Sequence, residues 1–189
     1  MSRFDPDRPL APDPHAELPP VPSFTLVSDD IEDGKPLRRP QTVAGGGVTP
    51  RLRWSGFPQQ TRSFLLTVFD ADAPRGGLWH WVVADIPPTV THVLRGASTA
   101  RTLLPGRAGK QPLGPDALYL PNSLGLRVFL GAAPPKGDRP HRYYVAVHAL
   151  DVPHLDLPNG ARTKPPDVAA AALPHTLARA VIVGTYQQP

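Results

Sequence analysis

The sequence predicts a mainly β protein: an antiparallel or mixed β-sandwich with short peripheral helices. Proline makes up 27 of the 189 residues, nearly three times its usual share of ~5%. Because proline is excluded from helix interiors and central strands, much of the chain must form loops, edges and turns. From Phe24 onward, short apolar runs alternate with turn signals, a pattern typical of all-β domains.

The chain divides into a tail and one expected domain. Residues 1–22 are rich in proline and in charges of both signs and contain no apolar stretch. We therefore expect a flexible or loosely packed tail, without the apolar segment of a secretory signal. Residues 23–189 are then one domain, which is long enough to bury a sizeable core.

The expected strands follow from apolar runs. Val48–Trp54 predicts an edge strand because Pro50 interrupts it. Ser63–Asp70 is apolar at both odd and even positions, as a buried central strand should be. Further strands are expected at Trp79–Ile86, Leu118–Leu120, Leu126–Leu130 and Arg142–Leu150. Near the C-terminus we expect a short helix at Ala169–Leu173, and at Ala178–Tyr186 a helix that turns into a strand.

Composition narrows the classes of function. The chain has no cysteine, which excludes disulfides, thiolate nucleophiles and cysteine-based zinc sites. No run approaches the ~20 apolar residues of a membrane span, so we expect a cytoplasmic protein without a transmembrane segment. The net charge of +4 comes from scattered basic residues. We expect no nucleic-acid partner, because the sequence lacks an RNA-binding signature with interleaved aromatics.

Two loops, each followed by a histidine that begins a strand, suggest one pocket. The first contains Asp70 and Asp72, which can face one cavity because residues i and i+2 of an extended chain point the same way. A proline corner at Pro74 follows, and His80 begins the next apolar run. The second loop, Gly131–Gly137, contains two consecutive prolines and leads to His141, Arg142 and Tyr143.

These motifs resemble those of the phosphatidylethanolamine-binding proteins, also called Raf-kinase-inhibitor-like proteins, and most of all their bacterial branch. The likeness runs from about Ser23 to Tyr186. It implies a β-sandwich fold and a non-enzymatic anion pocket for phosphate-bearing small molecules or phospholipid headgroups, with no cofactor. It also implies a homodimer and, by analogy with the eukaryotic branch, a protein partner such as a kinase.

The resemblance assigns ligand-binding roles to ten residues. They are Asp70, Asp72, Pro74, His80, Gly131, Ala133, Pro134, Pro135, His141 and Tyr143. The chain departs from the family pattern at Ala133, where many members have glycine, and at Ala71, where most have proline. Both departures bear on the shape of the pocket more than on the fold.

The chemistry of such a pocket predicts three further features. If the aspartates accept hydrogen bonds from His80 and His141, the pKa of each imidazole rises and the cationic form can bind phosphate. Fixed φ angles at Pro134 and Pro135 reduce the entropy cost of holding the loop. The tight corner after Asp72, together with the family resemblance, predicts a cis Ala73–Pro74 peptide bond, an uncommon state.

Two alternatives stay open at this level. Two carboxylates and two histidines could perform acid–base hydrolysis or hold a metal. Against an enzyme, the sequence shows no nucleophile elbow and no His-Glu-x-x-His motif. The basic charge could also serve a nucleic-acid or membrane-surface protein, although the scattered basic residues do not favour it. Structural explanations compete as well, because aspartate is common beside proline turns.

Overall fold

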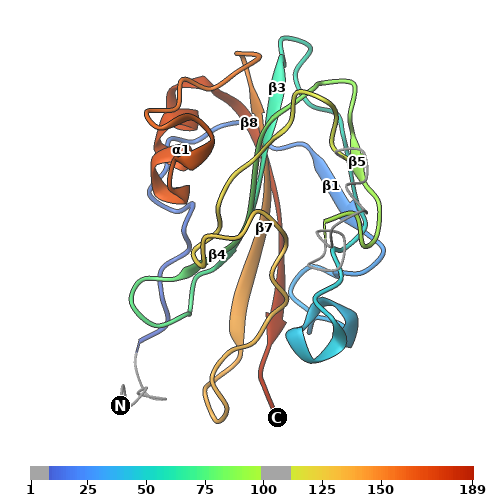
Figure 1. The fold of residues 1–189 in the computed structure, drawn as a ribbon, viewed down its shortest axis with the longest axis vertical. Coiled ribbons are helices and arrows are strands. Elements are labelled where there is room, and N and C mark those ends of the chain that lie inside the picture. The colour runs from blue at the N-terminus through green and yellow to red at the C-terminus, as the bar shows by residue number, and fades with distance from the viewer. Residues whose placement is uncertain (1–8, 99–111) are drawn as a thin grey trace.

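The computed structural model describes residues 9–98 and 112–189. Within them the protein forms two antiparallel β-sheets (Figure 1). The large sheet has the order β6-β4-β3-β7-β8, with β6 at Leu118–Tyr119, β4 at Leu78–Ile86, β3 at Ser63–Asp70, β7 at His141–Leu150 and β8 at Thr176–Tyr186. The small sheet has the order β1-β2-β5, with β1 at Thr25–Ser28, β2 at Leu52–Ser55 and β5 at His92–Val93. The predicted β-sandwich class is confirmed.

Helical structure is short and peripheral. The one α-helix of the described residues, α1 at Pro165–Ala172, begins with two prolines, which fit the first turn because its N–H groups have no intrahelical partner. In Figure 1 it lies on one side of the large sheet, while β1 lies on the other. The described residues also contain four 3-10 turns: η1 at Arg39–Gln41, η2 at Val43–Gly45, η4 at Gly160–Arg162 and η5 at Leu173–His175.

Strand β3 explains why the large sheet has two buried faces. Phe64, Leu66 and Val68 belong to the main core between the sheets. Leu65 belongs to a second core on the opposite face, which includes Val168 of α1. Since successive side chains of a strand point to opposite faces, a strand covered on both sides must be apolar throughout, as the sequence indicated.

Three expected elements differ from the structure. Residues 176–186 form one strand along their whole length, paired with β7 from His141↔Tyr186 to Leu150↔Thr176, so no helix begins there. Residues 126–130 form no strand. Strand β2 is the middle strand of its sheet, because Pro50 lies before the strand and leaves both of its edges able to pair.

The N-terminal segment 9–22 lies against the sheets. The backbone of Ala11 accepts a 2.6 Å hydrogen bond from Arg142 Nη2 and donates one of 3.3 Å to Asp72. Farther along, Pro22 accepts a 3.0 Å bond from the Arg179 amide. The expectation of a loose tail over residues 1–22 therefore does not describe this part of it, and residues 1–8 lie outside the described part of the chain.

The loop after Asp72 turns without a cis peptide bond. The prediction of a cis Ala73–Pro74 bond is wrong: this peptide is trans. The loop turns instead at Arg75, Gly76 and Gly77, which all have positive φ, so the corner needs no cis proline.

Among the described residues, no helix is long and apolar enough to cross a membrane.

Candidate functional site

A cavity of about 300 Å³, which we call the polar cavity after the Asp70, His80 and His141 side chains in its wall, lies where β3 ends and β4 and β7 begin. These strands are antiparallel neighbours in the order β4-β3-β7, so their ends meet at one edge of the sheet. Eight of the ten predicted residues line it: Asp70, Pro74, His80, Gly131, Ala133, Pro134, Pro135 and His141. Val43, Ala73, Leu78, Leu124 and Leu130 complete the wall.

The centre of the site is a histidine held between two carboxylates. His141 Nδ1 lies 2.8 Å from Asp70 Oδ2, and its Nε2 lies 3.0 Å from Asp138 Oδ2. Burial disfavours the charged ring, but the hydrogen bonds with Asp70 and Asp138 outweigh burial and raise the pKa of His141. An imidazole that donates from both nitrogens is cationic, so His141 is an imidazolium that neutralises one of two buried negative charges.

His80 differs from His141 in its protonation state. Its Nδ1 lies 3.0 Å from the carbonyl oxygen of Leu130, not from a carboxylate as expected. Burial lowers the pKa of His80, although the Leu130 carbonyl and the charge of Asp70 act in the opposite direction. The expectation that both histidines are raised in pKa by aspartates is therefore correct for His141 and wrong for His80. In the neutral ring with Nδ1–H donated to Leu130, Nε2 carries the lone pair.

Packing against the η1–η2 region holds the loop wall in place. The Ala132 amide donates a 3.0 Å bond to the Gln41 carbonyl, and the Ala132 carbonyl accepts one of 3.0 Å from Val43. A Cβ on Gly131 would lie 2.6 Å from the backbone of Thr42. Glycine is thus required there by close approach of two backbones, and the following prolines stiffen the same loop.

Asp72 lies outside the cavity, contrary to expectation. Its two oxygens accept 2.8 Å bonds from Nε and Nη2 of Arg142, a bidentate pair, and Oδ1 also accepts from the Ala11 amide. Burial disfavours the charged carboxylate, but the bonds from Arg142 outweigh it and lower the pKa of Asp72. The sequence prediction put Asp72 in the cavity because residues i and i+2 of an extended chain point the same way. That rule does not reach Asp72, because β3 ends at Asp70 and the chain turns after it.

Tyr143 also lies outside the lining residues. Its ring packs edge-on against His80, with ring centroids 5.2 Å apart and planes at 78°. Burial, with the charge of Asp70, raises the pKa of the Tyr143 phenol. Tyr143 therefore packs against His80 and does not form part of the cavity wall.

Sequence reasoning missed Asp138. Its side chain is fully buried, and it supplies half of the ion pairing of His141. Its Oδ1 also accepts a 2.8 Å bond from the Arg139 amide, which fixes the carboxylate. The signal was present, since an aspartate three residues before a strand-initial histidine can reach back to it across a tight turn.

Within residues 9–98 and 112–189, no group of three or more histidine and acidic side chains is arranged to hold a metal ion. In the polar cavity, both nitrogens of His141 already face carboxylates.

Comparison with known proteins places this chain in a family. Residues 27–187 match the family model for phosphatidylethanolamine-binding protein. UPF0098 protein YbcL of Escherichia coli K12 is 40% identical over 134 residues, which cover 68% of this chain and 69% of that protein. UPF0098 protein YbhB of the same organism is 35% identical over 142 residues, 72% of this chain and 84% of that protein.

A solved structure supports the same assignment. The crystal structure of Escherichia coli YbcL, described as a new member of the mammalian PEBP family, superposes with a TM-score of 0.77 and 33% sequence identity. The superposition covers 88% of this chain and 99% of that one. With the sandwich, the paired loops and the cavity at the strand ends, these matches show that the chain belongs to the phosphatidylethanolamine-binding protein family.

Proposed function

We propose that the polar cavity binds a small zwitterionic headgroup of the phosphoethanolamine type and does not transform it. The observation that carries the proposal is the arrangement of charge. Two buried carboxylates enclose one imidazolium, and a neutral histidine in the same cavity lies beside a proline-stiffened loop. Such a site offers a negative region and potential donors within one volume of about 300 Å³.

The ammonium end of the ligand is assigned to Asp70. The cluster of Asp70, Asp138 and the His141 imidazolium has a formal charge of −1, so it attracts a cation at close range. Of the two carboxylates, Asp70 lines the cavity and Asp138 does not. An ammonium group that reaches Asp70 would form a charge-assisted hydrogen bond there.

The phosphate end is assigned to His80 and the loop amides. The amides of Gly131 and Ala133 make no hydrogen bond in the part of the chain that the structure describes, so they can donate to phosphate oxygens. His80 Nε2 becomes a donor when the ring takes up a proton, while Nδ1 stays on Leu130. Phosphate binding should therefore be coupled to proton uptake by His80.

The absence of catalysis belongs to the same proposal. A His141 ring that donates from both nitrogens has no lone pair with which to accept a proton or to ligate a metal. A rigid site that holds the ground state of an anion also has no means of favouring a transition state over it. We expect no turnover of phosphomonoesters, phosphodiesters or carboxylic esters, with or without divalent metals.

Calorimetric titration with phosphoethanolamine tests the proposal. Because the folded pKa of His80 lies below its ordinary value of 6.5, affinity should rise as the pH falls below 6.5 and fade as the pH rises. His80→Ala should weaken binding by about 1.5–3 kcal/mol through loss of a charge-assisted bond. His154→Ala, which removes an exposed histidine outside the cavity, is the matched control.

Two results would count against the proposal. Unchanged affinity in His80→Ala, or tighter binding at alkaline pH, would remove the role of a protonated His80. Turnover of any of the three substrate classes that disappears in His141→Ala would move the protein to the enzymes.

A further inference from the structure

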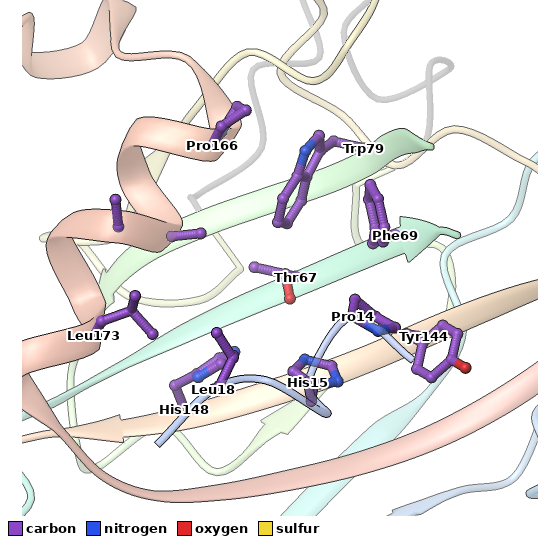
Figure 2. Close-up of a pocket in the computed structure, with 12 residues that line it drawn as sticks. Pro14, His15, Leu18, Thr67, Phe69, Trp79, Tyr144, His148, Pro166 and Leu173 are labelled. Atoms are coloured by element: carbon purple, nitrogen blue, oxygen red, sulfur yellow. The ribbon is translucent and has the colours of Figure 1, made fainter. Parts of the chain in front are cut away.

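A second cavity lies on the opposite face of the large sheet (Figure 2). Its volume is about 330 Å³, within the range of small-molecule sites. The sheet forms its floor, α1 and η5 form one wall, and the N-terminal segment forms the other (Figure 2). The lining residues are Pro14, His15, Leu18, Thr67, Phe69, Trp79, Tyr144, His148, Pro166, Ala169, Ala170 and Leu173.

The floor of this apolar cavity contains two buried polar side chains. Thr67 of β3 is 5% exposed, and His148 of β7 is 7% exposed. His148 Nδ1 accepts a 3.3 Å hydrogen bond from Nε of Arg179, so the proton of the neutral ring is on Nε2. Within the described residues, neither His148 Nε2 nor the Thr67 hydroxyl has a hydrogen-bond partner.

These two donors open onto the cavity, since neither is among the fully enclosed side-chain atoms that lack a partner. They are therefore available to a molecule inside it. Apolar residues would suffice at these two positions if the cavity were only a packing gap, as Leu65 does one position along the same face of β3. Ligand pockets characteristically combine an apolar lining with a few convergent polar groups.

We propose that this cavity binds a small, largely apolar molecule that presents one carbonyl oxygen to His148 and Thr67. The aromatic and aliphatic wall selects an apolar body. The donors select an acceptor, and a carbonyl oxygen can accept two hydrogen bonds through its two lone pairs. Arg179 behind the imidazole makes the floor unfavourable for a cation. At roughly 30 Å³ per atom, the cavity has room for about ten non-hydrogen atoms.

This site is separate from the headgroup site. The two cavities share no lining residue. The N-terminal segment closes one cavity and takes no part in the other, since Pro14, His15 and Leu18 line the apolar cavity alone. Binding of the apolar ligand therefore does not depend on the proposed function of the polar cavity.

Acetophenone and ethylbenzene are suitable probes, because they have similar size and differ in the carbonyl oxygen. Amide NMR spectra of the full chain, recorded during titration with acetophenone, should show saturable shifts at Thr67, His148 and Ala169. The amides of His80 and His141 should not move. No saturable shift, or shifts centred on His80 and His141, would overturn the site.

Variants test the shape of the cavity and its donors. Ala169→Leu fills the cavity from α1 and should weaken the binding of acetophenone by about tenfold or more. Ala171→Leu lies on the same helix but outside the lining, and it should leave the affinity unchanged. His148→Phe and Thr67→Val should each weaken the binding of acetophenone by about five- to tenfold. Ethylbenzene should bind these variants as tightly as the wild type or more tightly.

Two outcomes would refute the assignment of the carbonyl. One is an equal loss of affinity for acetophenone and ethylbenzene in His148→Phe and Thr67→Val. The other is no loss of affinity for either probe. Circular dichroism establishes that each variant is folded. If Ala169→Leu does not fold, the wild-type spectra and the Thr67→Val comparison still decide the question.

Discussion

The same three strands build two cavities, one lined by a carboxylate and two histidines and one lined by aromatic and aliphatic side chains around Thr67 and His148. Asp70, His80 and His141 line the first, and their sequence neighbours Phe69 and Trp79 line the second with Tyr144. Because adjacent residues of a strand point to opposite faces, each strand end supplies an ionisable group to one side and an aromatic ring to the other. A shift of one residue in register would exchange the two chemistries.

The buried histidines show how far environment decides a charge. Two carboxylates hold His141 as a cation. Burial, with the charges of Arg179 and His15, lowers the pKa of His148 to about 3, so that ring stays neutral. Both side chains are nearly inaccessible to solvent, and the difference comes from their neighbours alone.

Removal of Asp138 should give the largest effect. Asp138→Ala leaves a buried imidazolium with one carboxylate, and we expect a loss of about 3 kcal/mol or more in the free energy of unfolding. Urea unfolding measures this loss, with Asp156→Ala, at an exposed aspartate, as the control. Equal stabilities for the two variants would show that the polar cavity does not depend on its ion pairs.

The second prediction concerns pH. Below 6.5, His148 in the unfolded chain takes up a proton that the folded chain refuses until the pH approaches 3. Stability should therefore fall with decreasing pH in this window by about 1.4 kcal/mol per unit from His148. Arg179 of β8 and His15 of the N-terminal segment face the ring and maintain the shift. The free energies of unfolding of the wild type and of His148→Phe, measured from pH 6.5 to 4.5, isolate the contribution of His148. If the two free energies change with pH in parallel, the prediction is contradicted.

His141 should show the opposite dependence. Its folded pKa is raised above 6.5. Its stabilising contribution is therefore complete below 6.5 and is lost as the pH rises through the folded value. His148 and His141 should thus limit stability at opposite ends of the pH range.

The third prediction separates Asp72 from the polar cavity. Asp72→Asn weakens the bidentate pair with Arg142 and should cost about 1.5 kcal/mol of folding stability. Phosphoethanolamine affinity should not change, because Asp72 does not line the cavity. Asp70→Asn is the matched comparison and should abolish binding. Equal losses of affinity in both variants would restore Asp72 to the site.

The smallest effect is expected at Thr67. Thr67→Val removes a hydroxyl without a partner in the described chain, and should raise the free energy of unfolding by up to about 1 kcal/mol. Thr61→Val should do the reverse, because the Thr61 hydroxyl donates a 2.6 Å bond to the Pro58 carbonyl. Destabilisation of similar size in both variants would mean that Thr67 has a structural partner.

The strands that position the polar cavity could be predicted from the sequence with good accuracy. Ser63–Asp70 coincides with β3, and β4 and β7 each begin one residue before the predicted run. Residues 176–186 were harder to assign, since Ala178, Ala180 and Val181 suit a helix locally. Pairing with β7 along its whole length decided for a strand.

By itself, the sequence determined the β-sandwich class, the two loop-and-histidine motifs and their arrangement around one cavity. Those features depend on local physics: apolar period, proline stiffness and the geometry of strand ends. Only the tertiary structure decided that Asp138 pairs with His141, that Asp72 turns to Arg142, and that His80 is neutral. The apolar cavity likewise needed segments more than 50 residues apart, such as His15 and Thr67, to meet across the sheet. Hydrogen-bond partners and burial set the charge of a titratable group, and both arise from contacts between segments distant in the chain.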